Sequence, residues 1–235
     1  MMTKNNRSVT WMALMLVAAM TFGVLATASA QGKPLTAEEL TDKVQDFYKN
    51  ITDYQARFEQ TYTDMAAGKE SKSGGKVFFK KPGKMRWDYL TEGRTLDKVL
   101  VSDGKAFTIY EAEYQQYYRQ CLKDSALPTA LRFLMGTGDL RTEFNVAIKK
   151  SKQEGTHRLE LTPKKSSGKY KKVVFIVDAN DFSVRESIIY DPYNNTNRIV
   201  FVKPSVNKSL PDAGFDFTIP QGVRPLHDSD KIKCE

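Results

Sequence analysis

The strongest constraint on the fold is a series of short segments after residue 50 in which apolar and polar residues alternate or form brief apolar runs. A period of two is typical of β-strands, because successive side chains point to opposite faces of a sheet. The expected strands are Gln55–Thr63, Lys76–Lys80, Lys84–Leu90, Lys98–Ser102, Ala106–Tyr110, Gln115–Arg119, Phe144–Lys150, His157–Leu161, Lys171–Val177, Val184–Tyr190, Asn197–Val202 and Phe215–Ile219. Strands in this number and at this spacing predict one large antiparallel sheet that curls or closes.

Turn-forming residues separate many of these segments, since glycine, asparagine and proline favour the backbone conformations of tight turns. The expected turns are Ser73-Gly74-Gly75, Lys81-Pro82-Gly83, Asp103-Gly104, Ser166-Ser167-Gly168 and Tyr193-Asn194-Asn195. The short connections support antiparallel neighbours along most of the chain.

A helix is expected before the strands, over Ala37–Lys49. Thr36 and Glu39 have the spacing of a capping box, which satisfies free backbone amides at a helix start. An apolar stripe at helical spacing predicts that the helix packs on the sheet; it consists of Leu40, Val44, Phe47 and Ile51.

The strand pattern is interrupted between Leu127 and Arg141. Pro128 can start a short helix and Gly136 can end it. A second short turn is expected around Asp139–Arg141. The fold class is therefore mainly β with helices (α+β).

The first thirty residues have the pattern of an export signal. Lys4 and Arg7 precede an apolar stretch from about Val9 to Leu25, and Ala28-Ser29-Ala30 is the small-x-small pattern that signal peptidase cuts. The alternative is a membrane anchor, but the stretch is shorter than the roughly 20 apolar residues of a spanning helix. We expect a cleaved signal peptide over 1–30, one domain over 31–235, and a periplasmic location.

Charge and cysteine content restrict the partners and the compartment. The formal net charge is +8, but the basic residues are scattered and form no arm or single helix face, so nucleic acid is not expected as a partner. The two cysteines, Cys121 and Cys234, favour a disulfide in an oxidising compartment; two unrelated thiols are the alternative.

The sequence offers little for catalysis. It has two histidines, His157 and His227, and no G-x-S-x-G or HExxH motif. No set of residues predicts a metal site, so we expect no catalytic residues, no metal and no cofactor.

The order of several motifs resembles the LolA-type family of periplasmic outer-membrane lipoprotein carriers. The motifs are Ala56–Gln60, Gly75–Phe79, Lys81–Tyr89, Val101–Lys105, Pro128–Gly136, Leu161–Lys164 and Phe215–Val223. The resemblance implies an unclosed half-barrel of about eleven antiparallel strands, with helices as a lid over an apolar cavity. It also implies a monomer that takes acylated lipoproteins from an inner-membrane lipoprotein-releasing ABC transporter and delivers them to an outer-membrane lipoprotein acceptor. A lipid-sensing periplasmic regulator and a paralogous carrier of another lipid are the alternatives.

Strand alternation supplies candidate residues for the cavity wall, although an ordinary closed core is the competing interpretation. The candidates are Phe58, Tyr62, Val77, Phe79, Met85, Trp87, Phe107 and Ile109 from strands, with Leu131, Leu134 and Met135 from the lid. Members of the family often hold the lid with an arginine before the turn proline, and that position is Lys81 here. Because an ammonium lacks the planar fork of a guanidinium, we expect a single-point lid contact that is weaker; a solvated turn lysine without a lid contact is the alternative.

Overall fold

The computed structural model describes residues 34–124, 133, 138–166, 168 and 170–234. The chain divides into Met1–Pro34 and a compact unit over Leu35–Glu235. The fold below is that of the second unit. No helix among the described residues is both long enough and apolar enough to cross a membrane.

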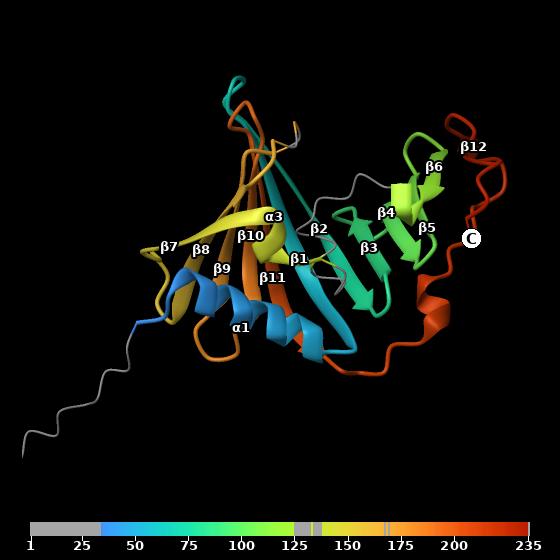
Figure 1. The fold of residues 1–235 in the computed structure, drawn as a ribbon. Helices are drawn as coiled ribbons and strands as arrows, with labels where there is room; N and C mark the ends of the chain where they lie inside the picture. Colours follow the sequence, from blue (N-terminus) through green and yellow to red (C-terminus); the bar gives the residue numbers. More distant parts are fainter. Residues whose placement is uncertain (1–33, 125–132, 134–137, 167, 169, 235) are drawn as a thin grey trace, which may run out of the picture. The chain divides into compact units, whose positions relative to one another are not determined.

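One twelve-stranded sheet forms the second unit, in the order β12-β6-β5-β4-β3-β2-β1-β11-β10-β9-β8-β7 (Figure 1). The strands are β1 Asp53–Asp64, β2 Lys69–Lys80, β3 Lys84–Leu90, β4 Leu96–Asp103, β5 Ala106–Glu111, β6 Gln116–Cys121, β7 Phe144–Lys149, β8 Thr156–Pro163, β9 Lys172–Asp178, β10 Val184–Tyr190, β11 Thr196–Val206 and β12 Arg224–Pro225. Strands β1 to β11 pair antiparallel, as predicted, and β12 pairs parallel with β6. The sheet is unclosed, because β7 and β12 end the strand order without pairing with each other.

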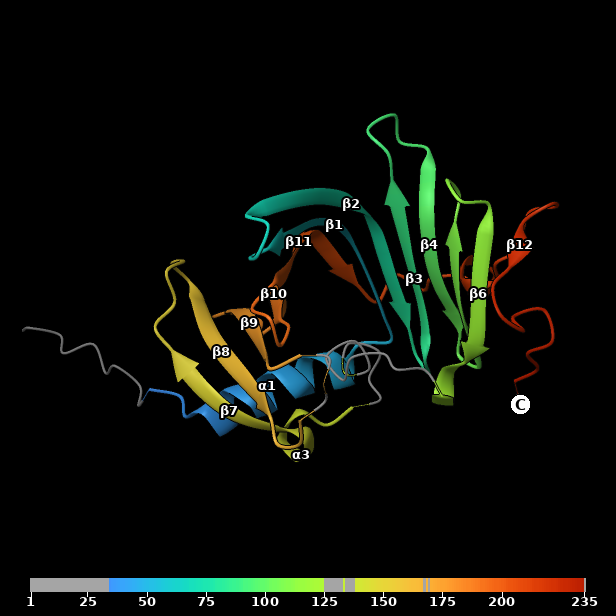
Figure 2. The same ribbon diagram turned by 90° about the horizontal axis from the view of Figure 1, so that it is seen from above.

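The predicted turn at Ser73-Gly74-Gly75 is wrong. These residues lie inside β2, and the turn that joins β1 to β2 falls at residues 65–68. A Cβ added to Gly75 would lie 1.8 Å from the carbonyl oxygen of Asp88 and 3.2 Å from the ring of Phe58. Glycine therefore permits a close approach of neighbouring strands at this position. The long β1–β2 hairpin curves over the rest of the sheet (Figure 2).

The predicted strand Phe215–Ile219 is also wrong. A 3-10 helix covers Asp212–Phe215, and the residues after it pair with no strand. Phe215 is nevertheless buried, and Phe217 packs against a cluster of Val99, Val101 and Tyr110. The apolar alternation thus reflects a segment lying on the sheet, without ladder hydrogen bonds.

Helix α1, Ala37–Asn50, lies across one face of the sheet, which arches over it in Figure 2. The predicted capping box is present, with the amide of Glu39 donating to Thr36 Oγ1 at 3.1 Å and that of Thr36 to Glu39 Oε2 at 2.8 Å. The helix buries Leu40, Thr41, Val44 and Tyr48 against the sheet. We call the sheet surface that faces α1 the inner face.

The segments outside the main sheet are short. Helix α3, Leu140–Glu143, begins at its cap Asp139, close to the turn expected at Asp139–Arg141. A 3-10 helix follows β6 at Leu122–Asp124. The helix expected at Pro128–Gly136 lies outside the described residues, except for Phe133, which is buried.

The C-terminal segment covers the edge strand β6. Arg224 and Pro225 pair with Gln116 and Tyr117, and Cys234 forms a disulfide with Cys121. The two Cα atoms are 5.3 Å apart and the cysteines are 113 residues apart in the chain. An exposed strand edge can recruit other chains, so this cover protects one end of the sheet.

Candidate functional site

A single cluster of apolar side chains lines the inner face, and α1 packs on part of it. It draws on α1 and on strands from β1 to β11. Most of the wall residues predicted from the sequence lie in it with 4 % exposure or less: Phe58, Val77, Phe79, Met85, Trp87 and Phe107. In this conformation they pack against one another, as a closed core would.

The other sequence candidates have different positions. Ile109 packs at the margin of the cluster, and Tyr62 is 40 % exposed towards the far end of β1. Leu131, Leu134 and Met135 lie outside the described residues.

Aromatic rings dominate the part of the cluster formed by β1, β2 and β3. Phe58 meets the Trp87 ring edge to face at a centroid distance of 4.8 Å. Trp87 lies 5.9 Å from Phe79 and 6.2 Å from Phe201. Such rings fill a wide apolar volume and adapt to different neighbours.

Sequence reasoning missed two buried tyrosines of this cluster. Tyr48 projects from α1 and Tyr54 from β1, with ring centroids 6.4 Å apart. The period-two pattern extends back from Phe58 to Tyr54, so the expected strand should have begun earlier. Tyr48 lies beside Phe47, which the helical stripe included and which is only partly buried.

The polar atoms of these aromatic residues differ in whether they form a hydrogen bond. The Tyr48 hydroxyl accepts a hydrogen bond from the amide of Val184 at 3.2 Å. The Tyr54 hydroxyl and Trp87 Nε1 are buried without a hydrogen-bond partner in the described part of the chain. Burial raises the pKa of both Tyr48 and Tyr54 above the ordinary value of 10, and raises that of Tyr89 to about 12.

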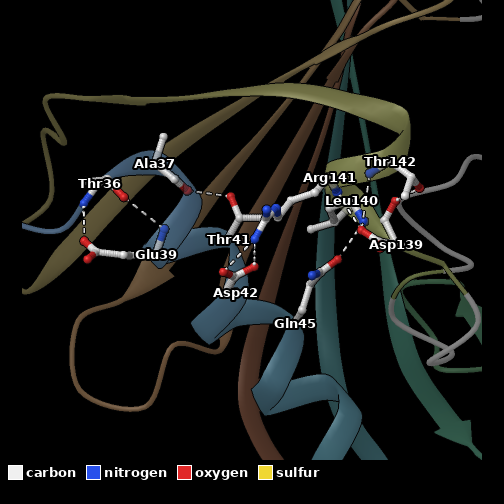
Figure 3. A network of polar contacts seen from close by, with 10 residues as sticks. All are labelled: Thr36, Ala37, Glu39, Thr41, Asp42, Gln45, Asp139, Leu140, Arg141 and Thr142. Atoms are coloured by element: carbon white, nitrogen blue, oxygen red, sulfur yellow. Dashed lines mark hydrogen bonds and ion pairs between the residues drawn. The ribbon is translucent and has the colours of Figure 1, made fainter.

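Polar contacts tie α1 to α3 at the margin of the cluster (Figure 3). Arg141 Nη1 donates to both carboxylate oxygens of Asp42, at 2.9 and 2.8 Å. The amide of Leu140 donates to Gln45 Oε1 at 2.7 Å. The ion pair lies outside the apolar packing, since Asp42 and Arg141 are about half exposed, whereas the side chain of Leu140 is fully buried in the cluster.

Lys81 binds the C-terminal end of α1. Its Nζ donates to the carbonyl oxygens of Tyr48 and Lys49, at 2.5 and 2.7 Å. An ammonium carries three donors, and two of them are used at the end of α1. These bonds do not test the contact expected with the lid helix over Pro128–Gly136, which lies outside the described residues except for Phe133. Partial burial lowers the pKa of Lys81 from its usual value. Contacts of Lys81 with residues 125–132 lie outside the described chain.

A small pocket of about 300 Å³ opens between α1 and the residues before α3. Its lining is Gln45, Asp46, Tyr48, Lys49, Phe133, Gly138 and Asp139. Tyr48 and Phe133 meet edge to face and both belong to the apolar cluster, whereas the remaining lining is mostly polar. The pocket thus places polar side chains next to the edge of the apolar cluster.

The two histidines lie far from any arrangement that suggests catalysis. His157 is the second residue of β8, and the ring of His227 packs on Tyr118. Within the described ranges, no group of three or more His, Cys, Asp or Glu residues is placed to hold a metal ion.

Comparison with known proteins agrees with this architecture. The "Outer-membrane lipoprotein carrier protein" of Dechloromonas aromatica is 28 % identical over 182 residues, covering 77 % of this chain and 85 % of that protein. The protein of the same name from Chromobacterium violaceum is 26 % identical over 198 residues, covering 84 % of this chain and 92 % of that protein. The crystal structure of an uncharacterised conserved protein from Thermus thermophilus shares the fold, with a TM-score of 0.52 and 13 % identity. The match covers 81 % of this chain and 98 % of that chain.

The family model for the outer membrane lipoprotein carrier protein LolA matches residues 49–218. This range runs from the end of α1 to beyond β11 and contains the inner face described above. The chain belongs to the LolA family of outer membrane lipoprotein carriers.

Proposed function

We propose that this protein is a periplasmic carrier that binds the acyl chains of lipoproteins on its inner face, without chemistry on them. The chain would enter the periplasm after removal of residues 1–30. It would receive acylated lipoproteins from an inner-membrane lipoprotein-releasing ABC transporter and deliver them to an outer-membrane acceptor. It would act as a monomer.

The observation that carries the proposal is the large apolar surface between one sheet face and one helix. Each buried methylene is worth about 0.8 kcal/mol, so a sixteen-carbon chain resists entering water by roughly 12 kcal/mol. A soluble carrier must replace the bilayer with an equally apolar wall. The cluster that contains Phe58, Phe79, Trp87 and Phe201 supplies such a wall over several neighbouring strands.

The contacts that hold α1 suggest how an acyl chain could enter, by displacement of the helix from the sheet. Besides the apolar side chains that it buries, the helix is held to the rest of the unit by a few polar contacts at its margins, from Lys81, Arg141 and Leu140. Exposed ion pairs and single hydrogen bonds are each worth about 1 kcal/mol or less. Displacement of α1 would expose the apolar cluster, and an acyl chain would then replace the helix side chains as its partner.

A release assay tests the proposal. Inner-membrane vesicles carrying an acylated lipoprotein and the transporter are incubated with ATP and the purified protein. A soluble complex of one lipoprotein with one carrier is expected, and the same lipoprotein without acyl chains should form none. Lipoprotein that stays in the vesicles with this protein, while a related carrier releases it, would refute the proposal.

A further inference from the structure

Two polar atoms in the apolar cluster have no hydrogen-bond partner among the described residues. They are the hydroxyl of Tyr54 and Nε1 of Trp87, whose residues are 2 % and 3 % exposed. Buried polar groups are almost always paired, because an unpaired one loses its bonds to water without replacement. The neighbouring Tyr48 follows the rule, since its hydroxyl accepts from Val184.

The two unpaired atoms belong to side chains that share neighbours. The Tyr54 ring, from β1, lies 5.9 Å from Phe79 and 6.0 Å from Phe201. The Trp87 ring, from β3, lies 5.9 and 6.2 Å from the same two phenylalanines. Two unpaired donors thus border one pair of rings on the inner face.

The chemistry of the two side chains defines what they could bind. An indole N–H donates and cannot accept. The Tyr54 hydroxyl keeps its proton, because burial raises its pKa far above the ordinary value. Trp87 Nε1 therefore needs a hydrogen-bond acceptor that enters an apolar site, and the Tyr54 hydroxyl can donate to a group of the same kind.

A charged acceptor fits this site poorly. No lysine or arginine is buried among the described residues, so a carboxylate beside Tyr54 and Trp87 would lack a buried counter-charge. Transfer of an unpaired charge into an apolar interior is far more costly than transfer of a neutral carbonyl that finds donors. A neutral carbonyl group attached to an apolar chain accepts hydrogen bonds and carries no charge, so it fits this site.

We propose that Tyr54 and Trp87 donate hydrogen bonds to the ester or amide carbonyls that join the acyl chains to a lipidated cargo. This inference rests on the proposed function and adds a selectivity to it. The inner face would prefer chains linked through a carbonyl over ether-linked chains and over free fatty acids. The donors stay unpaired in the empty protein and gain partners when cargo enters the cluster.

The test compares three probes, of which the first two differ in the carbonyls alone. One is a synthetic lipopeptide with two ester-linked hexadecanoyl chains, the second its ether-linked hexadecyl analogue, and the third hexadecanoic acid. Wild-type protein lacking residues 1–30 should bind the ester probe about 25-fold more tightly than the ether probe, because two hydrogen bonds are gained. One net hydrogen bond corresponds to about a fivefold change in affinity, so Tyr54→Phe and Trp87→Phe should each reduce that preference by about this factor.

Tyr110→Phe is the matched control, because Tyr110 is also buried but lies in the separate cluster with Val99 and Val101. It should keep the full ester preference. Its affinity for the ether probe should also equal that of the wild type.

The outcomes separate this inference from the proposed function. Equal affinity of the wild type for ester and ether probes would overturn the carbonyl contact and leave the carrier function intact. Failure to bind either probe would overturn the carrier function itself. Lower thermal stability of empty Tyr54→Phe than of wild type would show that the hydroxyl is already satisfied, which also overturns the inference.

Discussion

Lys81 and Tyr48 join the β2–β3 turn to the end of α1, with Lys81 Nζ 2.5 Å from the Tyr48 carbonyl oxygen. The same tyrosine is bound at its other end, where its hydroxyl accepts from Val184 on β10. Tyr48 therefore connects the cover helix with two distant parts of the sheet, through its backbone and through its side chain.

Replacement of Lys81 should change how readily α1 opens. Lys81→Leu removes both hydrogen bonds to the helix end, and we expect faster release of labelled lipoprotein to the acceptor. The effect should be about 1 kcal/mol, the scale of one net hydrogen bond, because Lys81 is only partly buried. Lys81→Arg introduces a planar donor fork and should slow the transfer. Equal transfer rates for all three proteins would mean that the bonds of Lys81 to the helix end do not restrain α1.

The Asp42–Arg141 ion pair should restrain the middle of α1. Arg141→Gln removes the ion pair between α1 and α3, so amide hydrogen exchange in α1 should be faster than in the wild type. The difference between the two proteins should shrink at high salt, because salt screens the wild-type ion pair. Arg158→Gln is the control, because it breaks a pair with Glu160 within β8 that does not involve α1. Equal acceleration of α1 exchange by both variants would contradict a specific restraint.

Loss of the disulfide should destabilise the fold measurably. It closes a loop of 113 residues, for which the chain-entropy model gives at most about 5 kcal/mol. We expect the Cys121→Ser, Cys234→Ser protein to lose about 2–4 kcal/mol of unfolding free energy in urea. Protease cleavage should then begin in the C-terminal segment that covers β6. An unchanged urea midpoint, or first cleavage elsewhere, would argue against the role of this segment as an edge cover.

Gly75→Ala should be among the most damaging small substitutions. The added methyl group would lie 1.8 Å from the Asp88 carbonyl oxygen on β3, so the β2–β3 pairing must separate. A loss of about 2–4 kcal/mol is expected, typical of overpacking against a backbone that must move. Gly214→Ala, where no atom lies within 4 Å of the added Cβ, should be neutral in the same denaturation experiment.

Local patterns in the sequence predicted much of the fold. The capping box at Thr36 and Glu39, the antiparallel strands and most of the turns depend on neighbouring residues, and they occur where expected. Local patterns could not predict that Gly74 and Gly75 lie inside β2 and form no turn. Their position depends on Asp88 and Phe58, which come close to these glycines only when the sheet bends.

The site was predicted less completely than the fold. Alternation placed Phe58, Phe79 and Trp87 on one face, but it could not identify that face as the one under α1. The positions of Tyr48 and Tyr54 depend on how the helix crosses the strands. The apolar spacing of Phe215 and Phe217 was typical of a strand, although burial on the sheet surface produces the same pattern without backbone pairing.

The location of the acyl chains is the central claim, and Trp87 can report on it directly. It is the only tryptophan in residues 31–235, and it lies in the inner-face cluster with 3 % exposure. A lipopeptide with brominated acyl chains quenches a tryptophan that its chains contact. The matched control carries Trp87→Phe and Phe217→Trp, which moves the reporter to the cluster under the C-terminal segment.

Quenching of Trp87 fluorescence by the brominated lipopeptide is therefore the most direct measurement. We predict strong, saturable quenching in the wild-type mature protein, no quenching by the unbrominated lipopeptide, and little quenching of the reporter at position 217. Saturable binding that leaves Trp87 unquenched, or that quenches the reporter at 217 instead, would contradict acyl-chain binding on the inner face.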